Sequence, residues 1–493
     1  MSINVYIAAT LKGFADKNNQ ISAEGNTVEQ VLKDIKDEYP ELGRVLFSEE
    51  GHVRDFINIY LRDTDVTDKL ITSVRDTDEI FIIPAMAGGS GEKKPDDART
   101  ESVISDERRK EISFGDPEIE RFNKHLMLKE IGVKGQKRIK ASKVLVIGLG
   151  SLGSPVVSYL AAAGVGTLGI ADHRKVDPGD IICQTLHTSR DIKRPRTASA
   201  KDKIRNIDKS INVEVYDDEI TPDNILDIVS GYDVVCDCSD SYRMRYMIND
   251  ACAQVSVPDV YASVYQFEAQ VSVFDAANGP CFRCLYPAPP PGGLVPTCAG
   301  SGILSPLAGV AGSIQAAEAL KLIVGGASTL TGKVLYFDLW NLSGRVLTIH
   351  EKPDCPVCGS GRGLIDVGDY DYDEFCGLKA HDDEIPVEGI SAEDLIARID
   401  RGDDITIVDV REPHERAIHR FPDAVVIPIG QLARRQKELD PTHDTIFICR
   451  EGKRSILAIN TLREAGYTGP MYSLTGGIEA TKNIIFANEG AWL

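Results

Sequence analysis

The sequence predicts an α/β protein with several domains, and three observations lead to that fold class. The chain has 493 residues, too long for one hydrophobic core and enough for about three domains of ~100–200 residues each. Apolar strand-like runs alternate with amphipathic helix-like stretches over residues 121–361, as is typical of a mostly parallel sheet. A stretch rich in charge, Ser, Gly and Pro, residues 90–116, separates this region from a shorter α/β segment before it.

The first segment has the pattern of a β-grasp domain. Residues 3–7 alternate like a strand, residues 27–35 have helical apolar spacing with Thr27 as N-cap, and further strands are expected at 57–61 and 80–83. We predict five segments in order: a β-grasp domain at 1–89, a flexible linker at 90–116, a large α/β domain with a mostly parallel Rossmann-like sheet at 117–362, a connector at 363–384 and a last α/β domain at 385–493.

The overall composition is ordinary for a globular protein, with 42% apolar and 26% charged residues. A net charge of −20 argues against general binding to nucleic acids or anionic membranes. The N-terminal stretch lacks the pattern of an export signal and no run approaches the ~20 apolar residues of a membrane span, so we expect a cytoplasmic protein. All eleven cysteines fall between Cys183 and Cys449, which in that compartment favours metal and thiol chemistry over disulfides.

The first domain ends in two glycines, in the run DEIFIIPAMAGG at residues 78–89. In isolation Gly88 and Gly89 would indicate a linker turn. After a β-grasp pattern, however, this run resembles the last strand and tail of the small ubiquitin-like sulfur carriers of the MoaD/ThiS type. Those carriers act through a free C-terminal glycine carboxylate, which is adenylated and converted to a thiocarboxylate. Here Ser90 follows, so the resemblance implies a protease that cuts after Gly89, where the linker composition leaves the bond accessible.

A glycine-rich turn follows the buried-strand run at residues 143–147 and opens the next helix. Glycines there let phosphate approach the backbone N–H groups at the helix N-terminus. About twenty residues further, Asp172 ends another strand, where a carboxylate can accept ribose hydroxyls. By itself the motif fits an NAD or FAD site, or a structural turn. The residues predicted to line the turn are Gly148, Gly150, Ser151 and Gly153.

Six further motifs decide between these readings. They are QTLH at 184–187, DCSD at 237–240, RYMIND at 245–250, QFEAQV at 266–271, CAGSG at 298–302 and GSIQA at 312–316. In this order they resemble the MoeB/ThiF adenylyltransferases, prokaryotic relatives of ubiquitin-activating enzyme, over about residues 121–361. The resemblance implies that Asp172 binds the ribose of ATP, that Gly150 and Ser151 bind its phosphates, and that Asp240 positions Mg²⁺.

The cationic residues of that family are altered in this chain. Cys183 stands at the place of an arginine and Asp180 at that of an asparagine, while Arg196 replaces a lysine and Lys124 an arginine. Arg to Lys keeps the charge but loses the bidentate fork, whereas Arg to Cys loses the charge. We expect Lys124 and Arg196 to contact the nucleotide, but a family fold with weakened or lost chemistry stays open. The nearby cations that would compensate are Arg174 and Arg190.

Two Cys-x-x-Cys pairs have the spacing of zinc ligands: Cys281 with Cys284, and Cys355 with Cys358. Four thiolates close a tetrahedral shell and leave no position for a catalytic water, so we predict a structural Zn²⁺ that joins distant segments. A redox role of the pairs is the alternative. The occurrence of two pairs, at matching places in the family, favours zinc.

Cys298 follows a Pro/Gly-rich stretch, residues 287–293, that predicts a mobile crossing loop. In the family, a cysteine at this place can form an acyl or persulfide link with the carrier tail. The alternative is a buried small hydrophobe, the usual fate of a free cysteine. Three more cysteines lie in apolar runs and are expected in the core: Cys236, Cys238 and Cys252.

A strand at residues 445–448 delivers Cys449 to the loop CREGKRS, just before a helical stretch. A cysteine there meets backbone N–H groups, a helix N-terminus and three cations, which stabilise a persulfide or a bound anion. The loop, with DVRE at 409–412 and LTGGI at 474–478, resembles rhodanese domains, in which Arg450 and Arg454 would assist Cys449. Cysteine phosphatases and arsenate reductases use a similar loop, so a phosphatase is the rival reading.

The order of domains resembles the adenylyltransferase/sulfurtransferase fusions, with a carrier added in front. It implies ATP-dependent adenylation of the carrier glycine and sulfur transfer from a rhodanese persulfide, to give a thiocarboxylate that supplies sulfur to a cofactor, amino acid, tRNA or metabolite. ATP, Mg²⁺ and structural Zn²⁺ are the implied cofactors. The expected partners are a carrier tail in cis or in trans, a sulfur donor such as a cysteine desulfurase or thiosulfate, the protease, and a second copy in a homodimer, with no nucleic acid and no membrane.

Two other functions stay open. A degenerate adenylation domain would act as a scaffold or docking partner, with only the rhodanese active. Alternatively, the carrier would be conjugated to a protein through Gly89.

Overall fold

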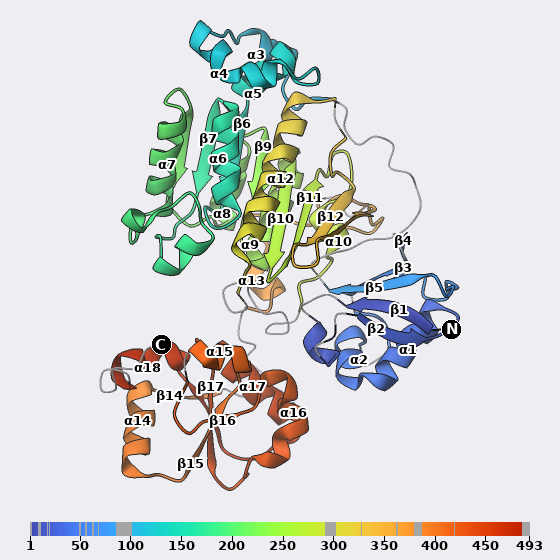
Figure 1. Ribbon diagram of the computed structural model, residues 1–493, viewed down its shortest axis with the longest axis vertical. Coiled ribbons are helices and arrows are strands. Elements are labelled where there is room, and N and C mark those ends of the chain that lie inside the picture. The colour runs from blue at the N-terminus through green and yellow to red at the C-terminus, as the bar shows by residue number, and fades with distance from the viewer. Residues whose placement is uncertain are drawn as a thin grey trace. The chain divides into compact units, whose positions relative to one another are not determined.

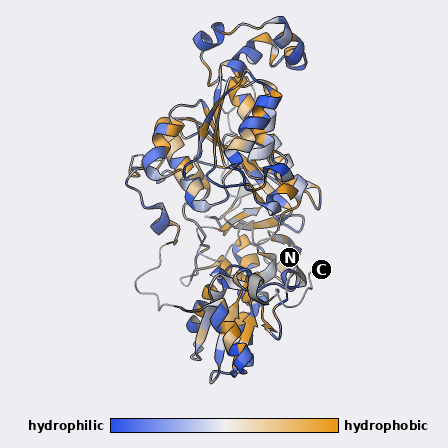
Figure 2. Cartoon of the chain, turned by 90° about the vertical axis from the view of Figure 1, so that its left-hand side faces the viewer, coloured by the Kyte–Doolittle hydropathy of each residue, from blue (hydrophilic) through white to orange (hydrophobic). Residues whose placement is uncertain are grey.

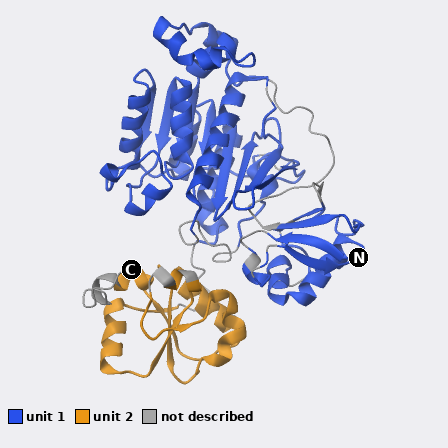
Figure 3. Cartoon of the chain, viewed as in Figure 1, with its two compact units in different colours: residues 1–290, 296–378 blue, residues 291–295, 379–493 orange. Residues whose placement is uncertain are grey.

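The computed structural model (Figure 1) describes residues 2–7, 11–16, 18, 20–48, 51–54, 57–61, 64–67, 69–84, 101–290, 302–326, 328–360, 363–378, 387–418 and 420–485. The chain divides into two compact units, coloured separately in Figure 3. The first comprises residues 1–290 and 296–378, and the second residues 291–295 and 379–493. The predicted fold class is confirmed, because a small mixed sheet, a large Rossmann-like sheet and a parallel C-terminal sheet follow one another along the chain.

The N-terminal sheet has the strand order β2-β1-β5-β3-β4, in which only the β1–β5 pair is parallel. As predicted, Thr27 caps α1, its hydroxyl accepting a hydrogen bond from Gln30 N at 3.3 Å, and the apolar face of α1 is buried. Gly88 and Gly89 lie outside the described residues. The elements are β1 (Ser2–Ile7), β2 (Gln20–Glu24), α1 (Val28–Glu38), α2 (Pro40–Leu46), β3 (Ile57–Leu61), β4 (Thr64–Asp65) and β5 (Glu79–Pro84).

The large sheet has eight strands in the order β13-β12-β11-β10-β9-β6-β7-β8. Neighbours from β10 to β8 are parallel, and β11, β12 and β13 extend the sheet with antiparallel pairs. Figure 2 shows hydrophobic residues along these strands, as expected for a sheet covered by helices. The strands are β6 (Lys143–Ile147), β7 (Thr167–Ala171), β8 (Asn212–Tyr216), β9 (Val234–Asp237), β10 (Asp259–Tyr265), β11 (Glu268–Phe274), β12 (Lys333–Asp338) and β13 (Ser343–Thr348).

The helices around this sheet include one that is long and apolar enough to span a membrane, α12. The sequence had predicted no such run. In the structure α12 packs against α6, β10 and β11, so its apolar composition is that of a core helix. The helices are α4 (Asp116–Leu126), α5 (Gly132–Ala141), α6 (Gly153–Ala163), α7 (Arg196–Ile207), α8 (Pro222–Val229), α9 (Tyr242–Val255), α10 (Phe282–Leu285) and α12 (Ser305–Val324), with the 3-10 turns η2 (Pro178–Ile182) and η3 (Ser189–Asp191).

The segment predicted as a linker, residues 90–116, differs from that prediction from residue 101 onward. Ile104 is buried in the core of the large domain, and α3 (Asp106–Lys110) packs against α5. Arg108 on α3 forms a salt bridge with Asp233, which precedes β9. A composition averaged over the segment hides these two anchors, because one apolar residue and one arginine suffice to hold a short stretch.

The second unit contains a five-stranded parallel sheet in the order β14-β18-β17-β15-β16. The predicted strand before Cys449 is β17, and DVRE begins at the last residue of β15. The strands are β14 (Glu388–Ile390), β15 (Ile405–Asp409), β16 (Val425–Val426), β17 (Asp444–Ile448) and β18 (Met471–Leu474), and the α-helices are α14 (Ala392–Arg401), α15 (Pro413–Ile418), α16 (Leu432–Arg435), α17 (Lys453–Glu464) and α18 (Gly477–Ile485).

Candidate nucleotide, metal and sulfur-transfer sites

The glycine-rich turn connects β6 to α6 at the carboxyl end of the parallel strands, where α/β sheets bind ligands. Gly148 has φ of +93°, and a Cβ on it would lie 2.6 Å from the carbonyl oxygen of Cys238. A Cβ on Gly153 would collide with the carbonyl oxygen of Gly148. Both positions therefore require glycine, and the turn keeps the backbone open at Gly150 and Ser151.

Asp172 lies beside this turn, just after β7, and is almost fully buried. Its Oδ2 accepts a hydrogen bond from Leu149 N and its Oδ1 one from Arg174 N, both at 2.9 Å. Burial by itself would raise the pKa of this carboxyl, but Arg174 and Arg196 hold the pKa below its usual value. Asp172 is therefore an ionised acceptor in a fixed orientation, as ribose binding requires.

Arg196 is the buried cation of the site, with 5% of its surface exposed. Its Nη1 lies 3.2 Å from Asp172 Oδ2 and its Nη2 2.6 Å from Asp180 Oδ2. The negative charge of Asp180, which the sequence placed near the phosphates, is thus paired inside the protein. Arg196 Nε and Gln184 Oε1 are buried polar atoms with no hydrogen-bond partner among the described residues.

A second arginine connects the two strand ends. Arg174 Nη1 lies 2.7 Å from Asp240 Oδ2, and Arg174 Nε lies 3.3 Å from Asp172 Oδ1. This arrangement joins the predicted ribose ligand to the predicted Mg²⁺ ligand. Cys183 lies in the same region, with its sulfur accepting a hydrogen bond from Ser151 Oγ at 2.9 Å.

Two predicted cations form no ion pair with these carboxylates in the described residues. Lys124 lies on α4, which packs against α5. Helix α5 leads into the amino end of β6 and the glycine turn follows its carboxyl end, so α4 and the turn are at opposite ends of the parallel strands (Figure 1). Arg190, in η3, is exposed, and in the described part of the chain it forms no ion pair with Asp172 or Asp240. Of the two candidates for compensation, the structure brings Arg174 to the site.

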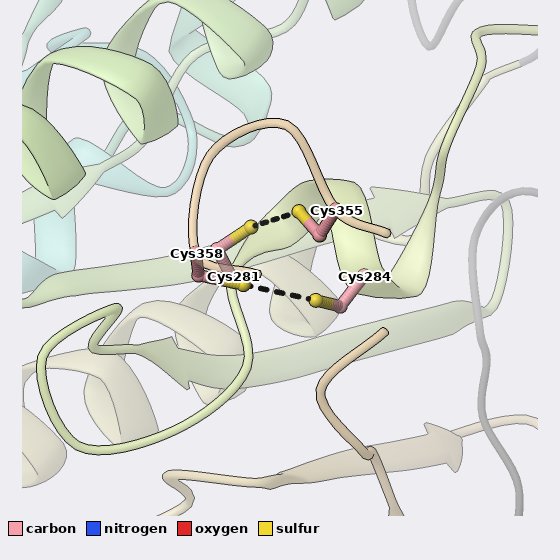
Figure 4. A group of neighbouring side chains, drawn as sticks. All are labelled: Cys281, Cys284, Cys355 and Cys358. Atoms are coloured by element: carbon pink, nitrogen blue, oxygen red, sulfur yellow. Dashed lines mark hydrogen bonds between the residues drawn. The ribbon is translucent and has the colours of Figure 1, made fainter. Parts of the chain in front are cut away.

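The four predicted zinc ligands, Cys281, Cys284, Cys355 and Cys358, come together, and Figure 4 shows their thiols pointing toward a common centre. All four sulfur atoms lie within 4.8 Å of one another. A tetrahedral ion with Zn–S bonds of ~2.3 Å requires S–S distances of ~3.8 Å. The cluster therefore has the donor set and the size for Zn²⁺. Lys352 N also donates to Cys284 Sγ at 3.3 Å, which favours a thiolate.

A buried ion pair beside the cysteines was not predicted. Arg283, between Cys281 and Cys284, donates to both carboxylate oxygens of Asp250 at 2.9 and 2.7 Å. Tyr372, in the segment predicted as a connector, donates to Asp250 Oδ2 at 3.0 Å from α13 (Tyr372–Phe375). The beginning of the connector is therefore packed on the metal cluster. Asp250 belongs to the motif RYMIND and Arg283 lies between two predicted zinc ligands, but their sequence positions give no sign that the two side chains pair.

Cys449 lies at the end of β17 and before α17, and is 1% exposed. Gly452 N donates to Cys449 Sγ at 3.1 Å. Gly477 closes the loop from the other side, where a Cβ would lie 2.5 Å from the carbonyl oxygen of Arg450. This backbone cradle and the N-terminus of α17 stabilise negative charge on a sulfur atom.

The flanking arginines differ in their roles. Arg454 forms a bidentate pair with Glu415, at 2.6 and 2.7 Å, and is mostly buried. Arg450 is half exposed and lies 3.5 Å from Glu479. Both arginines were predicted from the loop sequence, but Glu415 was not, because it lies 39 residues from Arg454 in the chain.

Replacing Glu415 with glutamine should loosen the loop around Cys449. Burial would raise the pKa of Glu415, but hydrogen bonds from Arg454 hold the pKa below its model-peptide value of 4.5. The pair therefore contributes stability above that pH, and loses it as the pH falls through the lower folded-state pKa. We expect the variant to lose about 2 kcal/mol of local stability at pH 7, measured by hydrogen–deuterium exchange in peptides from β17 and α17.

At acidic pH, where Glu415 is protonated, the hydrogen-exchange protection of the Cys449 loop should become equal in the wild type and in Glu415→Gln. The exposed pair of Arg435 with Glu438 provides the matched control, because Glu438→Gln removes a salt bridge that contributes little. Equal protection of the Cys449 loop in the wild type and in Glu415→Gln at neutral pH would contradict the prediction.

Comparison with known families agrees with the three domains. The model of the ThiS family matches residues 5–89, that of the ThiF family residues 122–357, and that of the rhodanese-like domain residues 391–484. These matches define a protein that joins a ubiquitin-like carrier, an adenylating domain and a sulfurtransferase domain.

Two curated relatives narrow this class. The probable adenylyltransferase/sulfurtransferase MoeZ of Mycobacterium tuberculosis (strain ATCC 25618 / H37Rv) is 37% identical over 371 residues, 74% of this chain and 92% of the relative. Adenylyltransferase and sulfurtransferase MOCS3 of Mus musculus is 39% identical over 330 residues, 65% of this chain and 71% of the relative. Among solved structures, E. coli MccB with MccA-N7isoASN has a TM-score of 0.45 at 19% identity, covering 49% of this chain and 75% of that one, and is too distant to add an argument.

The chain belongs to the MoeZ/MOCS3 family of adenylyltransferase/sulfurtransferases. The predicted resemblance to carrier, adenylyltransferase and rhodanese is confirmed. The protein is therefore an ATP-binding transferase that combines adenylation with sulfur transfer to a ubiquitin-like carrier.

Proposed function

We propose that this chain activates its own carrier domain after cleavage behind Gly89, and converts the released glycine carboxylate to a thiocarboxylate. The observation that carries the proposal is the ordered polar site beside the glycine turn, where Asp172 is ionised and fixed and Ser151 and Arg196 face the same region. The ThiS family match, which ends at residue 89, supports Gly89 as the activated residue.

The proposed reaction has three chemical steps. A carboxylate oxygen of Gly89 attacks the α-phosphorus of ATP, pyrophosphate leaves, and an acyl-adenylate forms. The outer sulfur of a Cys449 persulfide then attacks the acyl carbon, and AMP leaves. A second thiol must attack the resulting acyl disulfide, so that thiocarboxylate departs and this thiol becomes disulfide-bonded to Cys449. Cys298 is our candidate for that thiol, and it lies outside the described residues.

The nucleotide and metal ligands follow from the same proposal. Gly148, Gly150, Ser151 and Gly153 would hold the phosphates, and Asp172 the ribose. Asp240, with its side chain 60% exposed, would hold Mg²⁺, which supplies charge neutralisation during adenylyl transfer. The four-cysteine cluster would hold Zn²⁺ as a structural ion.

The proposed cycle also needs several partners. Lys124 is on α4, which packs on α5 at the amino end of β6, whereas the turn is at the carboxyl end, so a second copy of the chain would have to bring Lys124 to ATP. A cysteine desulfurase or thiosulfate would load Cys449, and a protease would free Gly89. All cysteines in the described part of the chain are unpaired, which supports a reducing compartment such as the cytoplasm.

The test is intact mass of protein from its native host, followed by ATP–pyrophosphate exchange with carrier ending at Gly89. We expect a fragment of residues 1–89 and exchange that depends on it. A carrier ending at Ala87 is the matched control, because it lacks both glycines. An uncut chain without exchange would contradict the proposal.

That negative result would favour the second candidate, in which only the rhodanese is active and the adenylating domain is a scaffold. Cys183 is the observation behind it, since a cysteine stands where the family has a cation. A large gain of exchange in Cys183→Arg would mark the natural site as impaired.

A further inference from the structure

The polar site beside the glycine turn contains three carboxylates and two guanidinium groups that pair with them. One of the two guanidinium groups is already paired with carboxylates of the protein. Arg196 is 5% exposed and binds Asp172 and Asp180 through its two Nη atoms. Moving Arg196 toward a ligand would leave the buried Asp172 with fewer partners, which is costly for a buried charge.

Arg174 differs from Arg196 in how its side chain is held. Its backbone is fixed, because its N donates to Asp172 Oδ1 at 2.9 Å and its carbonyl oxygen accepts from Arg196 N at 3.0 Å. Its side chain, however, is 38% exposed, and its strongest contact is with Asp240, which is 60% exposed. An ion pair that open to solvent contributes little net stability. If the guanidinium turns away, Arg174 Nε leaves Asp172 Oδ1, from which it lies 3.3 Å. Asp172 then still keeps its hydrogen bonds from Leu149 N and Arg174 N and its ion pair with Arg196, so the guanidinium can change partners without leaving a buried carboxylate unpaired.

We propose that Arg174 supplies the phosphate-binding cation that is missing at Cys183, and that it leaves Asp240 when Mg²⁺–ATP binds. Asp240 is the proposed Mg²⁺ ligand, so the metal and Arg174 compete for the same carboxylate, and the released guanidinium turns to the triphosphate. A guanidinium binds phosphate oxygens in bidentate fashion, which a thiol at position 183 cannot do. The inference rests on the ATP site proposed above.

The location of Arg174 also determines which phosphates it contacts. Asp172 and Leu149 fix the ribose end of the site. Asp240, the partner of the Arg174 guanidinium, would hold the Mg²⁺ that neutralises charge on the triphosphate. The guanidinium is therefore expected at the β- and γ-phosphates, and AMP should not need it.

The experiment measures binding of Mg²⁺–ATP and of AMP to the full chain by isothermal titration calorimetry. Arg174→Gln should weaken ATP binding by ~10–100-fold, the effect of losing a charged hydrogen bond, and change AMP binding less than about twofold. Arg174→Lys, which keeps the charge but not the fork, should fall between. In the Arg174→Gln background, Cys183→Arg should restore most of the ATP affinity.

Arg190→Gln is the matched control, because it removes an exposed arginine of the same domain that forms no ion pair with Asp172 or Asp240 in the described residues, and it should leave both affinities unchanged. Equal loss of ATP and AMP binding in Arg174→Gln would overturn the inference, since it would mean that Arg174 only positions Asp172. Unchanged ATP binding would also overturn it. Wild-type protein that binds ATP but gives no pyrophosphate exchange would refute the proposed function alone, while wild-type protein that binds no ATP would refute both.

Discussion

Sulfur transfer should disappear when Cys449 is replaced by alanine. The thiol is held at 3.1 Å from Gly452 N in a closed backbone loop, and the structure offers no second thiol in the described part of that loop. Because the persulfide forms on this sulfur atom, its removal eliminates the covalent intermediate and not merely an assisting contact. We expect a fall of at least ~1000-fold, as for other nucleophile deletions.

The measurement is thiocyanate formation from thiosulfate and cyanide, together with the mass of the persulfide on the wild-type protein. Cys376→Ser is the matched control, because it removes another buried thiol outside the loop. Persistent sulfur transfer in Cys449→Ala would contradict the assignment. Hydrolysis of an aryl phosphate by the wild type, with no sulfur transfer, would favour the phosphatase reading.

The same variant separates the two halves of the proposed cycle. ATP–pyrophosphate exchange needs the glycine turn, Asp172 and the carrier tail, and none of these lies in the second unit. Cys449→Ala should therefore keep exchange and lose only thiocarboxylate formation. Loss of both activities would mean that the sulfur-bearing loop contributes to adenylation.

Local sequence patterns predicted the parts of the sites that one strand and its following loop create. The turn at Gly148–Gly153, Asp172 after β7 and Cys449 after β17 were all predicted because a strand end, a glycine and a functional residue lie together in sequence. The two Cys-x-x-Cys pairs were predicted for the same reason, and their approach over 74 residues followed from zinc stoichiometry.

Pairings between distant residues could not be predicted. Arg174 with Asp240 spans 66 residues and Glu415 with Arg454 spans 39. A salt bridge leaves no periodic signal, so its partner is found only when the strands are assembled. Arg174 is the clearest case. The sequence suggests Arg174 and Arg190 equally as compensating cations, and the structure distinguishes them because the Arg174 side chain contacts Asp172 and Asp240.

Loss of the metal from the four-cysteine cluster is expected to lower the stability of the first unit strongly. Cys355→Ser should release the metal and lower the thermal unfolding midpoint of the first unit by ~10 °C, because structural zinc supplies several kcal/mol of folding free energy and each kcal/mol shifts the midpoint by ~2–4 °C in a domain of this size. The buried Cys281 and Cys284 and the partly exposed Cys358 would be left without their ion. Inductively coupled plasma mass spectrometry should find about one zinc per wild-type chain and almost none in the variant.

A control variant and the behaviour expected of a redox site test whether the cluster is a structural zinc site. Cys183→Ser removes a thiol outside the cluster and should keep both the zinc and the unfolding midpoint. A cluster that works by redox chemistry would instead contain no zinc and would form disulfides that disappear on reduction. The buried pair of Arg283 and Asp250, bound by Tyr372, argues for a rigid structural role, because α9, α10 and the connector helix α13 are joined beside the cluster by side chains 3% exposed or less. Loss of zinc should therefore expose peptides around Arg283 and Tyr372 to hydrogen exchange, whereas a purely redox pair would leave them protected.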